Sequence, residues 1–242
     1  MKSMAQPYRF LGLFLSLNIA FQLISDATAG KIITVAGQGI SVTVLYFPFT
    51  YLLADIITEV YGYAQARTIL WYTLFASIIA GIFYQIAILV PAAPFFKHGD
   101  AYDIVFGVVP RVLVGGWLAV FSGEISNNYV MAKMKILTNG RFLWTRTIGS
   151  TIIGEGVNTA VFYVVALGGV LPTDQLFGGI FAGWIIKTLV ETIMTPVTYI
   201  VINYLKKAEG VDYYDRGTNF SPFIVEPIQL PASQEPVTAK NK

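Results

Sequence analysis

Two acidic residues, Asp55 and Glu59, lie inside an apolar stretch that is long enough to cross a lipid bilayer. Residues four apart share one face of a helix, so both carboxylates are expected to point the same way. A charged side chain in the bilayer core costs about 2.5 kcal/mol or more, and such residues usually face a protein interior or a wet cavity. We therefore predict that Asp55 faces the inside of a helix bundle. For Glu59, beside Tyr61 and Gly62, a water-exposed helix end is an equally good interpretation.

Three later apolar stretches carry polar and aromatic side chains at helical spacing. The three stripes are Trp117, Phe121, Glu124 and Asn128; Thr151, Glu155, Asn158 and Phe162; and Trp184, Lys187, Glu191 and Thr195. Lys187 and Glu191 have the spacing of an ion pair within one helix, with either a structural or a gating role. At about 1.5 Å per residue, we predict that these stripes and Asp55 converge on one cavity in the cytoplasmic half of the membrane.

Carboxylates next to aromatic rings are suited to bind a flat heteroaromatic base. The rings stack on its faces, and a carboxylate accepts the paired N–H donors of a guanine-type edge. Glu155, with Asn158 and Phe162 on its stripe, is the first candidate for this role, and Glu124 is the second. The other predicted substrate contacts are Asp55, Thr151, Asn128 and Trp117, although an asparagine such as Asn128 is equally suited to bridge two helices.

The composition indicates an integral membrane protein. Hydrophobic residues make up 55% of the 242 residues and charged residues 12%, about half the charged fraction of a soluble domain. The chain has no cysteine, and the single histidine, His98, excludes a two-histidine metal site. We therefore expect no metal, no cofactor and no enzymatic activity. The net charge of +2 is too small to indicate nucleic-acid binding.

The apolar stretches predict an all-α bundle of six transmembrane helices in one domain, residues 1–207, followed by a cytoplasmic tail, residues 208–242. Residues 209–223 of the tail carry aromatic side chains among their charges and are expected to pack on the cytoplasmic face, and from about residue 231 the tail is expected to be disordered. The first helix could be misread as a signal peptide, but polar residues at Asn18, Gln22 and Asp26 interrupt it. A kink is expected at Pro196. The predicted helices are about 10–29, 42–60, 68–90, 106–130, 147–169 and 176–205.

The basic residues predict the orientation. With a cytoplasmic amino terminus, nine lysines and arginines fall inside and only Lys31 and Lys97 outside, so both termini are expected in the cytoplasm. A short echo between residues 26–31 and 128–133, each preceding a helix with a buried carboxylate, suggests two inverted three-helix halves.

Several blocks of sequence resemble the queuosine precursor transporter family, also called the vitamin uptake transporter family. They cover nearly the whole chain in the family's order. The blocks are Phe47-Pro48-Phe49-Thr50-Tyr51 with Asp55, Glu59, Tyr61 and Gly62; Pro110-Arg111; Lys133-Met134-Lys135 with Gly140-Arg141 and Trp144-Thr145-Arg146; Ser150-Thr151-Ile152-Ile153-Gly154-Glu155; and Asp212-Tyr213-Tyr214-Asp215 with Phe220-Ser221-Pro222-Phe223.

The resemblance implies a bacterial inner-membrane protein that imports queuine or deazaguanine bases for transfer-RNA modification, with a purine-like small molecule and the lipid bilayer as its partners. Two positions depart from the family pattern: Asn158 replaces an aspartate and Asp26 replaces an asparagine. An alternative is a membrane-embedded binding component that works with a separate ATPase, since this chain has no phosphate-binding glycine loop. Either could form a homo-oligomer. The third class is an intramembrane enzyme, but this chain lacks a nucleophile paired with a base, which such an enzyme needs.

Overall fold

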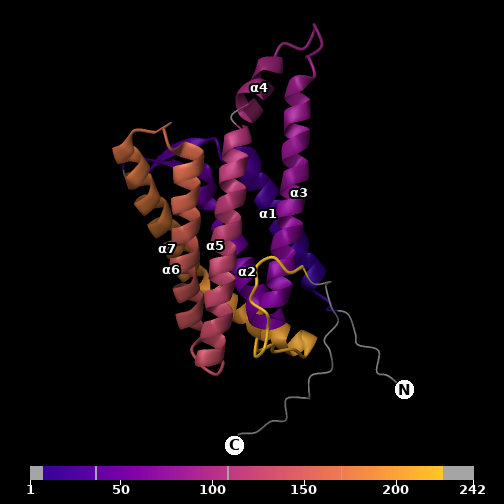
Figure 1. Ribbon diagram of the computed structural model, residues 1–242, viewed down its shortest axis with the longest axis vertical. Coiled ribbons are helices and arrows are strands. Elements are labelled where there is room, and N and C mark those ends of the chain that lie inside the picture. Colours follow the sequence, from indigo (N-terminus) through magenta and orange to yellow (C-terminus); the bar gives the residue numbers. More distant parts are fainter. Residues whose placement is uncertain (1–7, 36, 108, 170, 226–242) are drawn as a thin grey trace, which may run out of the picture.

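The computed structural model describes residues 8–35, 37–107, 109–169 and 171–225 (Figure 1). Most of the described chain is helical, and one short β-hairpin joins the first two helices. The helices are α1 (Leu11–Thr28), α2 (Pro48–Tyr61), α3 (Tyr63–Leu89), α4 (Gly99–Gly107), α5 (Val109–Leu137), α6 (Leu143–Phe162) and α7 (Thr173–Glu209). A 3₁₀ turn (Val42–Leu45) precedes α2, and a π-helical turn (Tyr163–Leu167) extends α6.

Five of the described helical segments are long and apolar enough to cross a membrane, so the predicted membrane class is confirmed but the sixth span is not. The five are α1, α3, α4 continued by α5, α6 with its π turn, and α7. The exception is α2, which has 14 residues and a length of about 21 Å. Every residue of α2 except Phe49 is buried, so it is an internal helix surrounded by the others.

The predicted helix 42–60 was too long at its start for a physical reason. Strands β1 (Ile32–Val35) and β2 (Gln38–Ser41) form an antiparallel hairpin, with Ile32 paired to Ser41. The 3₁₀ turn follows, and its cap is Ser41, whose hydroxyl accepts a hydrogen bond from the Thr43 amide. The α-helix begins only at Pro48, whose fixed φ and missing N–H suit the first helical position.

The boundary between α2 and α3 is a single residue, Gly62, with a φ of 88° that favours glycine. The sequence had predicted a loop up to Arg67. In the structure Arg67 lies inside α3, is fully buried, and donates to the carbonyl oxygens of Asn219 and Ser221.

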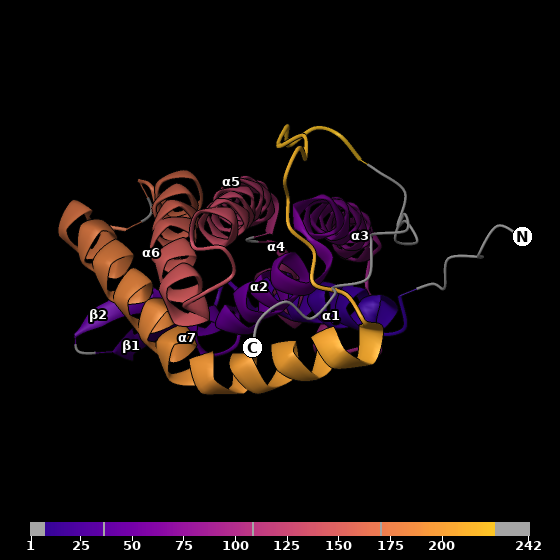
Figure 2. The ribbon, with the colours of Figure 1, turned by 90° about the horizontal axis from the view of Figure 1, so that it is seen from below.

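The helices run between two ends of the bundle, which we call the hairpin end, where β1 and β2 lie, and the tail end, where residues 8–10 and the α5–α6 connection lie (Figure 1). Seen from the tail end, α7 changes direction along its length and crosses beneath the bundle (Figure 2). Pro196 lies inside this helix, as predicted for a kink. The two inverted halves remain a prediction.

Helices α5 and α6 approach each other closely at glycines. A Cβ added to Gly154 of α6 would lie 2.6 Å from the Cβ of Asn127 on α5, and one added to Gly123 of α5 would lie 2.6 Å from the Cβ of Asn158 on α6. Small residues allow such close packing of helices in membranes. The polar side chains of α5 and α6 are therefore held against one another in the interior.

The segment after α7 packs against the tail end, as expected for residues 209–223. The Asp215 carboxylate accepts from the amide of Tyr63, the Trp71 indole donates to the carbonyl of Pro222, and Lys135 donates to the carbonyl of Tyr213. Burial raises the pKa of Asp212, but Lys135 and Lys206 outweigh this and hold it below its ordinary value. The predicted disorder from residue 231 lies outside the described residues.

Candidate functional site

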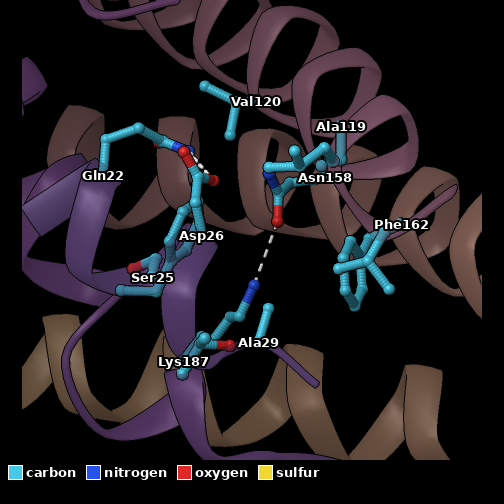
Figure 3. Close-up of a pocket in the computed structure, with 14 residues that line it drawn as sticks. Gln22, Ser25, Asp26, Ala29, Ala119, Val120, Asn158, Phe162 and Lys187 are labelled. Carbon is cyan, nitrogen blue, oxygen red and sulfur yellow. Dashed lines mark hydrogen bonds between the residues drawn. The ribbon is translucent and has the colours of Figure 1, made fainter. Parts of the chain in front are cut away.

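A pocket opens inside the bundle in its hairpin half (Figure 3). Its empty space is about 440 Å³, the open mouth included. Its walls come from the last turns of α1, the 3₁₀ turn and the residue before α2, the first half of α5, and parts of α6 and α7. The lining residues are Gln22, Ser25, Asp26, Ala29, Thr43, Phe47, Val112, Leu113, Gly116, Ala119, Val120, Asn158, Phe162 and Lys187.

The wall formed by α1 is a hydrogen-bonded polar stripe. The Gln22 amide donates to Asp26 Oδ1 over 2.8 Å, and the hydroxyl of Ser77 on α3 donates to Asp26 Oδ2. One turn earlier, Asn18 accepts from the hydroxyl of Thr73 over 3.1 Å. Two polar atoms of this wall, Gln22 Oε1 and Ser25 Oγ, are buried without a hydrogen-bond partner among the described residues. Their hydrogen-bonding capacity is not used by the described part of the protein.

Opposite this wall stands Lys187, which reaches from α7 to α6. Its Nζ lies 3.1 Å from Glu155 Oε2 and 3.0 Å from Asn158 Oδ1, and 4.6 Å from the centre of the Phe47 ring. The predicted pair between Lys187 and Glu191 is therefore wrong. The α6 helix packs beside α7 and offers Lys187 both a carboxylate and an amide, so the lysine bonds across helices instead of along its own.

Deeper in the bundle lie four buried carboxylates, which we call the carboxyl cluster: Asp55 of α2, Glu124 of α5, Glu155 of α6 and Glu191 of α7. The Asn127 amide donates to Asp55 Oδ1 over 2.7 Å. The carboxyl groups of Asp55 and Glu191 face each other, but neither oxygen of Glu191 has a normally formed hydrogen bond to a described residue. The sequence thus identified the buried acids correctly.

The position of the pocket differs from the expected one. The sequence placed a cavity in the half nearer the α5–α6 connection, whereas the pocket lies in the hairpin half. On each of the four helices, the residue of the carboxyl cluster lies closer to the tail end than the pocket residues do. Of the predicted substrate contacts, Asn158 and Phe162 line this pocket, and so does Lys187, which the sequence had assigned to an ion pair. Glu155 reaches it through Lys187, with its own Oε1 left without a partner among the described residues.

Three of the remaining predicted contacts, Asn128, Thr151 and Trp117, have partners within the protein. Asn128 accepts from the hydroxyl of Thr58 and so bridges α5 and α2, which was the alternative interpretation of this residue. The Thr151 hydroxyl donates to the carbonyl of its own helix at Thr147. The Trp117 indole donates to Ser77 Oγ over 2.7 Å and thereby supports the hydroxyl that binds Asp26.

Glu59 lies apart from the pocket, at the tail end, in a buried ion-pair network. Its carboxylate accepts two hydrogen bonds of 2.8 Å from the Arg146 guanidinium and one of 2.5 Å from Lys206, and Lys135 Nζ lies 3.4 Å away. Asp212 of the tail bonds both lysines. The interpretation of Glu59 as a solvent-exposed helix end is wrong, because three cations surround it in the interior.

Sequence reasoning missed the pocket residues Gln22, Asp26 and Phe47. A signal for two of them was present, since Asn18, Gln22 and Asp26 recur every four residues on one face of α1. On its own, that stripe indicated only that the first helix is a transmembrane helix and not a cleaved signal peptide. Its partner hydroxyls, Thr73 and Ser77, are also four apart on α3.

A bundle with five apolar helices of membrane-spanning length around a polar pocket defines a multi-pass membrane protein. The family described as "Putative vitamin uptake transporter" matches residues 41–201, and the chain belongs to this family. The matched region contains the carboxyl cluster, Asn158 and Lys187, but not the polar stripe of α1.

Two curated relatives share the similarity. One, from Bacillus subtilis (strain 168), is named "Probable queuosine precursor transporter" and is 27% identical over 192 residues, covering 78% of this chain and 82% of the relative. Another of the same name, from Haemophilus influenzae, is 25% identical over 124 residues, or 50% of this chain and 49% of the relative. No solved structure matches the chain.

Proposed function

We propose that this protein imports a queuosine precursor, either queuine or a deazaguanine base, across the bacterial inner membrane. The observation that carries the proposal is the pocket, which combines acceptors, an amide and aromatic rings in the interior of a transporter-family bundle. The names of the two relatives support the same substrate class.

The pocket supplies the chemistry that a guanine-like base requires. Asp26 and Gln22 Oε1 offer acceptors to ring and exocyclic N–H groups, and Asn158 both donates and accepts. Phe47 and Phe162 line the pocket, and their rings can stack against the ring of the base. We propose that Glu155 takes part when Lys187 moves aside, since Glu155 Oε1 already lacks a donor. The other predicted contacts do not line this pocket, and in this proposal they do not touch the base while it is bound there. They are Glu124, Asp55, Thr151, Asn128 and Trp117.

The direct test is rescue of queuosine in transfer RNA. A bacterial strain that requires an external precursor and lacks its own transporter is supplied with each base in turn, with and without this protein. We expect queuosine to return with at least one base. Expression at the membrane without any rescue would contradict the proposal. The alternative of a component that depends on a separate ATPase predicts rescue only when that ATPase is present, and the names of the relatives give it no support.

The orientation follows from the charges at the two ends. At the hairpin end Arg111 joins Lys31 and Lys97, and its guanidinium donates to the carbonyls of Val165 and Gly168. Apart from Lys187, which lines the pocket, the other described basic residues of the helical region lie toward the tail end, which we propose to be cytoplasmic.

We therefore expect both termini inside, and a pocket that opens to the outside. Reporter fusions at Lys97 and Asp174 should report an external position, and fusions at Gly140 and Lys207 an internal one. Opposite results at two of these four sites would refute the orientation.

A further inference from the structure

We propose that the facing carboxyl groups of Asp55 and Glu191 carry a proton that crosses the membrane together with the base. This inference rests on the proposed function and adds its energy source. The two residues come from different helices, α2 and α7, and both side chains are more than nine-tenths buried. Neither residue lines the pocket, so the pair is separate from the site proposed for the base.

The first argument is a shortage of hydrogen-bond donors around the carboxyl cluster. Six buried acceptor atoms there have no partner among the described residues, whereas the unpartnered donors on the same helices are two, the amide nitrogen of Asn128 and the hydroxyl of Thr188. The acceptors are Asp55 Oδ2, Glu124 Oε1, Asn127 Oδ1, Glu155 Oε1 and both oxygens of Glu191. A buried acceptor without a donor is costly, and a protonated carboxyl group becomes a donor. Protons thus supply what the cluster lacks.

The second argument is charge. Four ionised carboxylates would face a single cation, Lys187, in the described part of this interior, and Lys187 already pairs with Glu155. Two adjacent carboxylates that are removed from water cannot both be ionised without a large cost. One proton shared between Asp55 and Glu191 removes both the repulsion and part of the donor shortage. The geometry of the pair is therefore that of a proton-binding site.

The groups around the pair leave this conclusion intact. Asn127 of α5 donates to Asp55, and two hydroxyl residues of α6 are neighbours of the pair, Ser150 beside Asp55 and Thr151 beside Glu191. The titratable neighbours are Glu155, the buried Tyr51 of α2, whose hydroxyl donates to the carbonyl of Gly154, and Glu59, which is neutralised by its own cations. Among the described residues no group of three acidic or histidine side chains is placed to hold a metal ion.

The helices that carry the pair also offer a way to load and unload it. Pro196 lies five residues after Glu191 and has no N–H to donate to the carbonyl of Thr192, which weakens α7 at this point. A bend of α7 there moves Glu191 relative to Asp55 on the internal helix α2. In our proposal the carboxyl oxygen gains a proton from the external side through the pocket, an O–H bond forms, and the same proton is released to the cytoplasm after the base leaves.

The test uses the purified full chain in liposomes that contain a pH-sensitive dye, in sodium-free buffer. Radiolabelled queuine and a radiolabelled deazaguanine base are the probes. We expect base entry to be accompanied by acidification of the interior. For an uncharged base and one proton per base, a gradient of one pH unit, acid outside, should drive about tenfold accumulation.

Two variants, Asp55→Asn and Glu191→Gln, remove the titratable group with little change in shape. Each should still exchange labelled for unlabelled base but no longer accumulate it with the pH gradient. Asp103→Asn, an exposed carboxyl group on α4, is the matched control and should accumulate base like the parent.

The outcomes separate the two proposals. Exchange by the parent protein without proton entry, or accumulation that requires sodium, overturns proton coupling and leaves the proposed function in place. Gradient-driven accumulation by both variants also overturns it. Failure of the parent to exchange either base overturns the proposed function together with the inference that rests on it. Because the parent's own proton entry is measured, the test does not depend on whether the variants fold.

Discussion

Replacing Glu59 by glutamine is expected to cost about 3–5 kcal/mol of stability, the usual loss when one partner of a buried ion pair is removed. The side chain is fully buried and accepts from Arg146 and Lys206, with Lys135 at 3.4 Å. In the variant these three cations would face one another with the partly exposed Asp212 as their remaining carboxylate in the network. The helices α2, α5, α6 and α7, which Glu59 and its partners join, would separate first at the tail end.

The measurement is thermal unfolding of the detergent-solubilised protein, followed by tryptophan fluorescence and by the amount that remains monodisperse on heating. Asp103→Asn makes the same carboxylate-to-amide change at an exposed position and should unfold like the parent. A loss below about 1 kcal/mol for Glu59→Gln would show that the network behaves like a solvated surface pair.

The buried acidic residues were the part of the molecule that the sequence predicted best. An acidic residue inside an apolar helix has few physically acceptable positions, so Asp55, Glu124 and Glu155 can be assigned to the interior from their places in the apolar stretches alone. The packing of the tail could also be predicted, because aromatic residues among the charges between Asp212 and Phe223 indicated a segment that packs against the protein. Both expectations agree with the structure.

The helix boundaries and the hydrogen-bond partners of buried side chains were harder to predict from the sequence. Hydropathy does not distinguish a 3₁₀ turn from an α-helix, so the apolar run from Val42 was assigned to one helix although Pro48 marked the true start. Lys187 could bond along its own helix or across to α6, and spacing along one helix reveals only the first option. The choice depends on which faces of α6 and α7 meet, which is a property of the whole bundle.

The position of the pocket was missed for the same reason. The stripe of Asn18, Gln22 and Asp26 becomes part of a site only because α1 packs on α3, where Thr73 and Ser77 hold it in place. Neither the packing of α1 nor the direction of the pocket toward the hairpin end follows from the residues of α1 alone.

The role of Glu155 can be separated from its ion pair with Lys187 by comparing single and double variants. Lys187→Met alone leaves a buried carboxylate without its cation and should lower stability more than Lys187→Met combined with Glu155→Gln, which removes both charges. A double variant that is less stable than both single variants would contradict a direct pair between the two residues. Thermal unfolding in detergent gives this comparison without any substrate.

The effects of the same variants on binding of the base should differ from their effects on stability. Glu155→Gln keeps the shape of the side chain but replaces one acceptor oxygen with a donor, which would oppose the N–H groups of a guanine-like base. Hydrogen bonds to a charged group contribute about 1.5–3 kcal/mol each, so we expect at least about tenfold weaker binding. The measurement is equilibrium binding of labelled queuine and of a labelled deazaguanine base to purified protein, with Glu124→Gln as the comparison because its carboxylate is equally buried and does not bond Lys187.

The double variant makes this prediction decisive. If Glu155 reads the base, Lys187→Met with Glu155→Gln should recover stability but not binding, because the removal of both charges repairs the interior without restoring the acceptor. If Glu155 only neutralises Lys187, the double variant should recover both stability and binding. In that case the base would be read by the α1 wall, and Asp26→Asn and Gln22→Leu should then cause the loss of affinity that Glu155→Gln does not.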